Sequence, residues 1–302
     1  MSRAARIAGL FALAAILATP TAAPAQQPEP LPRRDARLVA AALDALPAQR
    51  PGTIDLYAVG FAGDATEDVF RNEVGYFATL ATGRLKARGV ATLVNHIDSL
   101  ERAPMALATY ENLRDLLDGI AARMDVEEDV LLLYLTMHGT PEHELALVFP
   151  PFVEDALIPE DLRTVLDEAG IRNRVLVISA CYSGGFIRQL KGPDTLVITA
   201  ARADRPSFGC GAGSSVTWFG RAWMVEGLNR SASFADAYEY ATRRVRGWEK
   251  AEKIEASFPQ ISEGRRIRDR LAQWRSQTPS GEPVAYPYPI EELETVVRTR
   301  KQ

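Results

Sequence analysis

Cysteine and histidine, the residue types best suited to act as nucleophile and general base near neutral pH, are scarce in this chain of 302 residues. The cysteines are Cys181 and Cys210, and the histidines are His96, His138 and His143. A cysteine thiolate attacks carbonyl carbon, and a neighbouring imidazole can take the thiol proton and later return it to a leaving amine. The number of possible Cys–His pairs is therefore small.

Two of these residues come directly after apolar runs that are typical of buried strands. His138 follows residues 129–137 (DVLLLYLTM), and Cys181 follows residues 174–180 (RVLVISA); glycine comes soon after each. Because the carboxyl ends of parallel strands lie at one edge of a sheet, the two side chains can meet there although 43 positions separate them. Free backbone N–H groups at the turn after Cys181 favour a thiolate and an oxyanion. We therefore predict Cys181 as nucleophile and His138 as general base and acid.

The elements that must position this pair alternate along the chain. Strands are predicted at 53–61, 90–97, 129–137, 144–149, 174–180, 195–201 and 258–262. Helices are predicted at 35–46, 67–85, 110–124, 159–169, 184–190, 218–229, 233–253 and 264–274. Unbroken apolar strands that alternate with helices are typical of an α/β fold with a mostly parallel sheet covered on both faces. Ligands bind beyond the carboxyl ends of such strands, which is where the predicted pair lies.

The two ends of the chain differ from this body. Residues 1–25 combine Arg3 and Arg6, a short apolar run and a small-x-small pattern at 23–25, so we expect a secretory signal peptide and an exported, periplasmic or secreted protein. An uncleaved N-terminal anchor is the alternative. Residues 279–289 contain four prolines and are predicted to be extended. We divide the chain into a signal peptide (1–25), an N-terminal linker and helix (26–50), an α/β domain (51–262) and a charged, Pro-rich C-terminal extension (263–302).

Composition excludes several classes of protein. Hydrophobic residues make up 47% and charged residues 25% of the chain, as in ordinary globular domains. The net charge of −4 gives no reason to expect nucleic acid as a partner, because phosphate binding needs a basic surface. Two cysteines are too few for a disulfide framework or a Cys-rich zinc site. After the first 25 residues no apolar run is long enough to cross a bilayer, so we expect no stable membrane insertion once the signal peptide is removed.

The motifs around the predicted pair resemble those of a known family. The segments LLLYLTMHG (131–139) and LVISACYSGGF (176–186) resemble caspase-like cysteine peptidases, and more closely the bacterial members of the legumain-like C13 peptidase family. The resemblance runs from about residue 53 to residue 262, and it includes the segments 59–61, 67–76, 196–210, 218–221 and 258–261. It implies a three-layer caspase-like sandwich and an endopeptidase that acts on a peptide or protein substrate through a thioester acyl-enzyme, with no metal and no other cofactor.

The same resemblance implies roles for single residues. Cys181 would be the nucleophile and His138 the base, and the backbone N–H groups of Gly139 and Cys181 would form the oxyanion hole. Arg71 falls where legumain has an arginine that lines the pocket for the residue before the cut, and a guanidinium suits a carboxylate or a carboxamide oxygen.

The pocket departs from legumain at other positions. Ser179 stands where legumain has an acid that helps to select asparagine, and Ser214 and Ser215 lie in the following pocket loop without an aligned acid. We include these three serines among the predicted substrate-binding residues. A preference for asparagine does not follow, and acidic or small polar residues before the cut are equally compatible with the sequence.

Other chemistry fits the sequence less well. Ser183 lacks the leading glycine of a G-x-S-x-G nucleophile turn. The group His138, Glu142, His143 and Glu144 does not have the H-E-x-x-H spacing of a helical zinc site.

Several interpretations stay open at the level of sequence. Cys210 is either a buried thiol near the pocket or the partner of Cys181 in a disulfide. The chain is either a peptidase, a transamidase or transpeptidase that uses the same dyad, or a non-catalytic caspase-like binding module. The charged segment after Ser262 either presents a solvated face or acts as a lid or autoinhibitory element over the site.

Overall fold

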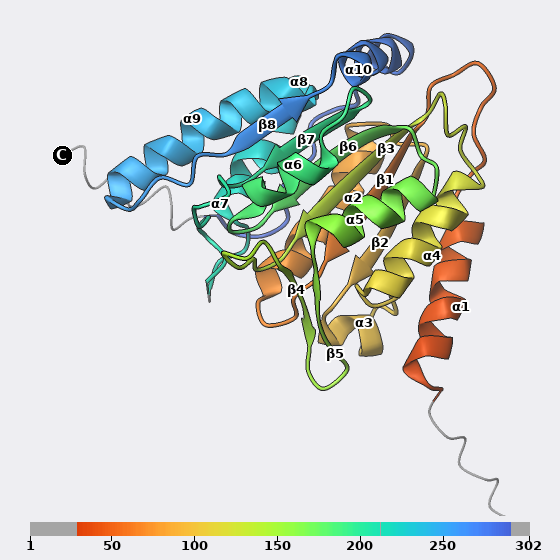
Figure 1. The fold of residues 1–302 in the computed structure, drawn as a ribbon, viewed down its shortest axis with the longest axis horizontal. Helices are drawn as coiled ribbons and strands as arrows, with labels where there is room; N and C mark the ends of the chain where they lie inside the picture. The colour runs from red at the N-terminus through yellow and green to blue at the C-terminus, as the bar shows by residue number, and fades with distance from the viewer. Residues whose placement is uncertain (1–28, 212, 291–302) are drawn as a thin grey trace, which may run out of the picture.

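The computed structural model describes residues 29–211 and 213–290, and the predicted signal peptide lies outside this part of the chain. A mixed sheet crosses its centre with the strand order β2-β1-β3-β6-β7-β8, in which β8 alone is antiparallel to its neighbour (Figure 1). The strands of this sheet are β1 (Leu56–Ala62), β2 (Gly89–Val94), β3 (Val130–Thr136), β6 (Asn173–Ser179), β7 (Thr195–Thr199) and β8 (Gln260–Glu263). Every residue of β1 and β3 is buried, as expected for strands covered on both faces.

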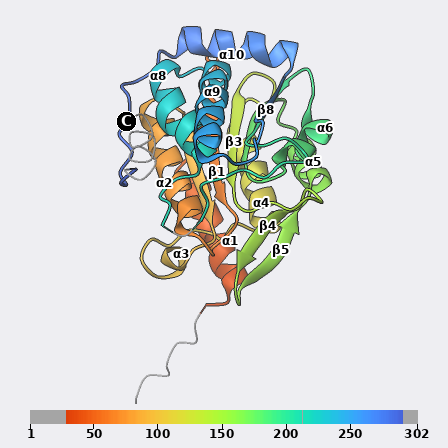
Figure 2. The ribbon, with the colours of Figure 1, turned by 90° about the vertical axis from the view of Figure 1, so that its left-hand side faces the viewer.

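Helices form a layer on each side of the sheet, which Figure 2 shows nearly edge-on. One layer contains α1 (Leu31–Asp44), α4 (Tyr110–Ala121), α5 (Pro159–Glu168) and α6 (Ile187–Leu190). The other contains α2 (Asp68–Gly83), α7 (Trp218–Gly220), the π-helical η2 (Arg221–Leu228), α8 (Asn229–Ser231), α9 (Phe234–Glu252) and α10 (Arg265–Gln277). Alternate residues of β3 enter the two cores: Leu131, Leu133 and Leu135 pack with α4 and α5, whereas Leu132 and Tyr134 pack with α2. The chain therefore has the three-layer caspase-like α/β architecture that the sequence predicted.

Three short features lie at the carboxyl ends of the parallel strands: a helix, a hairpin and a 3₁₀ turn. Helix α3 (Ile97–Glu101) follows β2, and β4 (Leu145–Phe149) pairs with β5 (Val153–Leu157) in an antiparallel hairpin after β3 (Figures 1 and 2). The 3₁₀ turn η1 (Ser183–Phe186) follows β6 and leads into α6. Sequence analysis predicted neither α3, which has five residues, nor β5, whose central residues are partly or fully exposed and show no apolar run. The predicted helices and the other strands are all present, with ends shifted by a few residues.

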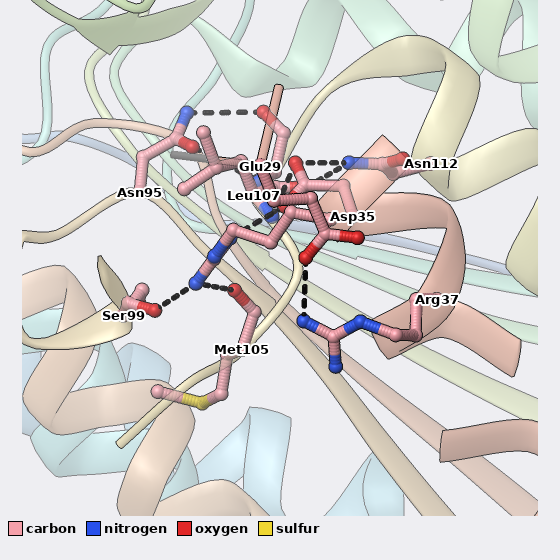
Figure 3. A network of polar contacts seen from close by, with 10 residues as sticks. Glu29, Asp35, Arg37, Asn95, Ser99, Met105, Leu107 and Asn112 are labelled. Atoms are coloured by element: carbon pink, nitrogen blue, oxygen red, sulfur yellow. Dashed lines mark hydrogen bonds and ion pairs between the residues drawn. The ribbon is translucent and has the colours of Figure 1, made fainter. Parts of the chain in front are cut away.

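Helix α1 is attached to the body through a buried carboxylate (Figure 3). Asp35 is 4% exposed and accepts hydrogen bonds from the backbone N–H of Leu107 (3.2 Å) and from Nδ2 of Asn112 (3.0 Å). Arg34 donates to the backbone oxygens of Ser99 and Met105. These contacts join α1 to α4 and to the segment between α3 and α4, so the helix of the predicted N-terminal region packs on the α/β body.

The C-terminal segment is also packed on the body as far as residue 290. Ile267 and Trp274 of α10 are buried in the core that contains α2 and α9. After α10 the chain passes α2, where the Tyr76 hydroxyl donates to the carbonyl oxygen of Val284 at 2.8 Å and the Tyr76 and Tyr286 rings meet edge-to-face. None of the described helices is both long and apolar enough to cross a membrane.

Candidate active site

The register between β3 and β6 brings the two predicted catalytic residues together. Thr136 and Ser179 are Cα partners in this parallel pair, and His138 and Cys181 each lie two residues further on. Because side chains alternate along a strand, the register places His138 and Cys181 on the same side of the sheet as Thr136 and Ser179, which is the side covered by α2. Both residues are partly exposed, whereas the strand residues before them are buried.

Contacts on two sides hold His138. Its ring lies edge-to-face against Phe70 of α2, with 5.1 Å between ring centroids. Its backbone oxygen accepts a hydrogen bond from the N–H of Ala146 in β4 at 3.0 Å, and Thr140 donates to the carbonyl of Glu144 at 3.0 Å. The β4–β5 hairpin and helix α2 together therefore fix the position of the imidazole.

The thiol of Cys181 contacts one residue of the loop between β7 and α7. The Ser207 backbone N–H donates to Sγ at 3.3 Å, and the Ser207 carbonyl oxygen lies 3.5 Å from Sγ. These contacts hold the thiol beside the loop. None of the hydrogen bonds among the described residues joins Sγ to the His138 ring, and catalytic hydrogen bonds are often long in enzymes without substrate.

The turn after Cys181 is sharp and gives Ser183 a structural role. Tyr182 has a left-handed backbone with φ of 55°, and its N–H donates to the Arg205 carbonyl at 2.8 Å. Ser183 is fully buried, and its hydroxyl donates to the Ala180 carbonyl at 2.7 Å. A buried and hydrogen-bonded hydroxyl is poorly placed to attack a substrate, so the site favours the cysteine over the neighbouring serine.

The backbone N–H groups of Gly139 and Cys181 lie just after the carboxyl ends of β3 and β6. The hydrogen bonds next to Gly139 are donated by Thr140 and Ala146, and in the described part of the chain neither Gly139 nor Cys181 donates a backbone hydrogen bond of its own. A β-carbon on Gly139 would lie 2.3 Å from the carbonyl oxygen of Cys181. Glycine at this position therefore allows the two loops to approach closely, and the role of the two N–H groups as an oxyanion hole stays a prediction.

Replacing Gly139 with alanine is expected to lower kcat/KM by about 10- to 100-fold, because a shift of about 1 Å between the two loops misaligns the reacting groups. The added carbon meets backbone, which can move only with the loop, so we also expect a loss of about 1–3 kcal/mol in the free energy of unfolding. Steady-state kinetics and urea denaturation would measure both. Gly75→Ala in α2 is the matched control, because its β-carbon meets nothing within 4 Å and should stabilise the helix by about 0.5–1 kcal/mol. Unchanged kcat/KM in Gly139→Ala would contradict the expectation.

Arg71 lies on α2 one residue after Phe70, whose ring contacts His138. Its side chain is 28% exposed, with Nη1 3.5 Å from Asp98 and Nη2 4.0 Å from Asp68. His96 joins the same group, since its Nε2 lies 2.9 Å from Asp68. The guanidinium therefore lies next to carboxylates from α2 and α3, and its role in binding substrate stays a prediction.

The predicted pocket serines are bonded to other parts of the chain. Ser179 is 2% exposed, and its Oγ lies 3.2 Å from Oγ1 of Thr217. Ser215 donates from its hydroxyl to the Pro289 carbonyl at 2.8 Å, and its own carbonyl accepts from the Tyr286 hydroxyl. Ser214 is partly buried, and its N–H donates to the Gly211 carbonyl at 3.0 Å. Contacts with substrate stay a prediction for all three.

The remaining cysteine and histidine take other positions. Cys210 packs beside Val69 and Phe70, and burial, followed by the nearby Cys181, raises the pKa of its thiol to about 11. Both cysteines are free thiols in this structure. The ring of His143 covers Gly185, where a β-carbon would lie 2.2 Å from it. Among the described residues no group of three or more His, Cys, Asp or Glu side chains could hold a metal ion.

Sequence analysis missed a buried acid that contacts β3 directly and β6 through Thr217. Glu73 of α2 is fully buried and accepts hydrogen bonds from Tyr134, Thr136 and Thr217. A signal was present, because Glu73 falls on the helix face whose other members are apolar, namely Val69, Phe70, Val74, Phe77 and Leu80.

A cysteine and a histidine at the ends of adjacent parallel strands, within a three-layer α/β sandwich, define a caspase-like arrangement. The model of the peptidase C13 family matches residues 118–265, which include both strand ends. The chain belongs to the peptidase C13 family, a family of cysteine peptidases. No curated protein matches the sequence.

Proposed function

We infer that this protein is a cysteine endopeptidase in which Cys181 is the nucleophile and His138 the general base and acid. The observation that carries this proposal is the β3–β6 register, since Thr136 and Ser179 are partners and the two reactive side chains follow at equal distance on the same face. Family membership supports the reaction class.

The proposed reaction begins with transfer of the Cys181 proton to the His138 imidazole. The thiolate attacks the carbonyl carbon of the scissile peptide bond, and the resulting oxyanion accepts hydrogen bonds from the N–H groups of Gly139 and Cys181. The imidazolium gives its proton to the leaving amine, the C–N bond breaks and a thioester remains. His138 then takes a proton from water, the hydroxide attacks the thioester, and the products are a carboxylic acid and the free thiol.

The surroundings of the dyad support these steps. The contacts with Ser207 hold Sγ beside the β7–α7 loop, and Phe70 limits the orientations of the imidazole. The Arg71 guanidinium next to Asp98 offers both hydrogen-bond donors and an acceptor to the side chain before the cut. Both donor and acceptor are needed to bind a carboxamide, while the guanidinium alone suffices for a carboxylate.

A peptide library treated with the purified protein tests the proposal directly. Mass spectrometry of the products would identify the bond that is cut, and iodoacetamide should stop cleavage in step with alkylation of Cys181. Addition of an amine acceptor separates hydrolysis from transamidation, since transfer produces an amide of the acyl fragment. Full cleavage after complete alkylation of Cys181 would overturn the proposal.

The expected export of the protein follows from the pattern of residues 1–25 and can be tested separately. Expression of the full chain in a Gram-negative host should yield a periplasmic protein whose N-terminus is Gln26. Replacing both Arg3 and Arg6 with glutamate should reduce export. A protein that retains Met1 and sediments with membranes would support the anchor instead.

A further inference from the structure

Glu73 carries a buried carboxylate that the proposed reaction does not use. Oε2 accepts hydrogen bonds from the Tyr134 hydroxyl at 2.8 Å and the Thr136 hydroxyl at 2.6 Å. Oε1 accepts from the backbone N–H of Thr217 at 2.8 Å and from its hydroxyl at 2.7 Å. None of these four donors carries a charge, and a β-carbon on the adjoining Gly220 would lie 2.0 Å from Oε1.

A carboxylate in this place is not required for the packing of α2. Burial raises the pKa of Glu73, although the hydrogen bonds from Thr136, Thr217 and Tyr134 oppose that shift. Removing a carboxylate from water is costly, and an apolar side chain of similar size often stabilises a core as well or better. Buried acids that the packing does not need are frequent at functional sites.

The partners of Glu73 are the residues on which the dyad depends. Thr136 lies two residues before His138, and its strand partner Ser179 lies two residues before Cys181. Thr217 contacts Ser179 and also accepts a hydrogen bond from the Gly220 N–H at the start of α7. The carboxylate thus joins α2, β3 and, through Thr217, β6 directly below the two reactive side chains.

Thr217 is also the last residue of the loop between β7 and α7. Near the middle of this loop Ser207 contacts the Cys181 thiol, and at its end Thr217 is held by Glu73. Between these points, Nδ2 of Asn72 in α2 donates a hydrogen bond to the carbonyl oxygen of Ser215 at 3.4 Å. The position of this loop relative to the nucleophile therefore depends on the bond between Glu73 and Thr217.

We propose that Glu73 is a positioning residue whose carboxylate fixes the β7–α7 loop against the strands that carry His138 and Cys181. The loop then holds the residue before the cut in line with the thiolate. This inference rests on the proposed peptidase function for its kinetic consequence, but the fixing of the loop can be measured without it.

The principal test compares Glu73→Gln with the wild type. Glutamine keeps the size of the side chain but has one acceptor oxygen, and its NH₂ group would face donors. We expect kcat/KM to fall by about 10- to 100-fold. We also expect smaller differences in kcat/KM between peptides that differ at the residue before the cut, because a loosened loop discriminates less. Asp129→Asn is the matched control, because Asp129 is equally buried and accepts two backbone N–H bonds before the start of β3, at the opposite edge of the sheet. It should lower the melting temperature without changing the peptide preference.

Cys210 gives a second readout that does not need peptidase activity. It lies in the same loop, and burial keeps its thiol largely protonated, so it should react slowly with iodoacetamide. We expect Glu73→Gln to increase its alkylation rate at least about fivefold, as followed by peptide mass spectrometry, and Asp129→Asn to leave the rate unchanged.

Two substitutions of Thr217 decide the matter if Glu73→Gln does not fold. Thr217→Val removes the hydroxyl and should change selectivity and Cys210 labelling in the same direction, whereas Thr217→Ser keeps the hydroxyl and should restore wild-type behaviour. Wild-type selectivity and labelling in Thr217→Val, or in a folded Glu73→Gln, would overturn the proposal. If Cys181→Ala cleaves as well as wild type, the peptidase function fails, and Cys210 labelling still tests whether Glu73 fixes the loop.

Discussion

Replacement of Cys181 with alanine is expected to lower kcat/KM for peptide hydrolysis by about 10⁴-fold or more, because no acyl-enzyme can form without the thiol. The protein itself should remain folded. Cys181 is partly exposed, and within the described part of the chain Sγ forms hydrogen bonds only with Ser207, so we expect the free energy of unfolding to change by less than about 1 kcal/mol. Steady-state hydrolysis of the best library peptide and urea denaturation would measure the two quantities.

The neighbouring serine offers a control within the same turn. Ser183→Ala removes a hydroxyl that donates to the Ala180 carbonyl and accepts from the Ala201 N–H. We expect it to cost about 1 kcal/mol of stability while kcat/KM stays within about tenfold of wild type. The opposite result, an inactive Ser183→Ala and an active Cys181→Ala, would mean that the nucleophile has been assigned to the wrong residue.

The sequence was sufficient to predict the strands of the sheet and the placement of His138 and Cys181 at its edge, because both depend on local patterns. The runs 129–137 and 174–180 are mainly apolar, and in the structure β3 is buried throughout while β6 is buried except at Arg174. His138 and Cys181 follow these strands directly, so the order of parallel strands is enough to bring them to one edge. Polar residues after buried strands are therefore the first positions to consider for a site in such folds.

Contacts between distant loops could not be predicted in the same way. Ser207 lies 26 positions from Cys181 and Thr217 lies 144 positions from Glu73, and neither pair belongs to a regular element at both ends. Their meeting depends on the path of an irregular loop, for which side-chain periodicity gives no information. Glu73 itself interrupts the apolar face of α2, and that interruption is the kind of local conflict that often marks a functional site.

The C-terminal region shows the same limit of sequence patterns. Helix α10 is strongly charged, and its composition alone is compatible with a solvated lid. The structure buries two of its residues, Ile267 and Trp274, in the core shared with α2 and α9. Two apolar residues seven positions apart on one helix face are enough to attach it, although most of its surface is polar.

Replacement of Trp274 with alanine is expected to lower the free energy of unfolding by about 3–5 kcal/mol, because it empties a large volume in a packed core. The indole is 2% exposed and stacks on Phe234 of α9, with 5.8 Å between ring centroids and 3° between planes. The Arg275 guanidinium lies 3.9 Å from the same ring. Urea denaturation measures the loss, and Gln273→Ala, at the exposed adjacent position, should change stability by less than about 0.5 kcal/mol.

The same experiment separates a structural helix from a detachable lid. A lid held by α10 would open when Trp274 is removed, so kcat/KM would rise and the free energy of unfolding would stay nearly constant. If α10 is instead a core helix, we expect the reverse. The variant should keep the wild-type kcat/KM at urea concentrations below its unfolding transition, and that transition should occur at a lower urea concentration. Truncation after Ser262 removes Ile267 together with Trp274, and for a core helix it should abolish cooperative unfolding instead of activating the enzyme. We expect that outcome because Trp274 stacks on Phe234 of α9, and both side chains are buried in the core that contains α2 and α9.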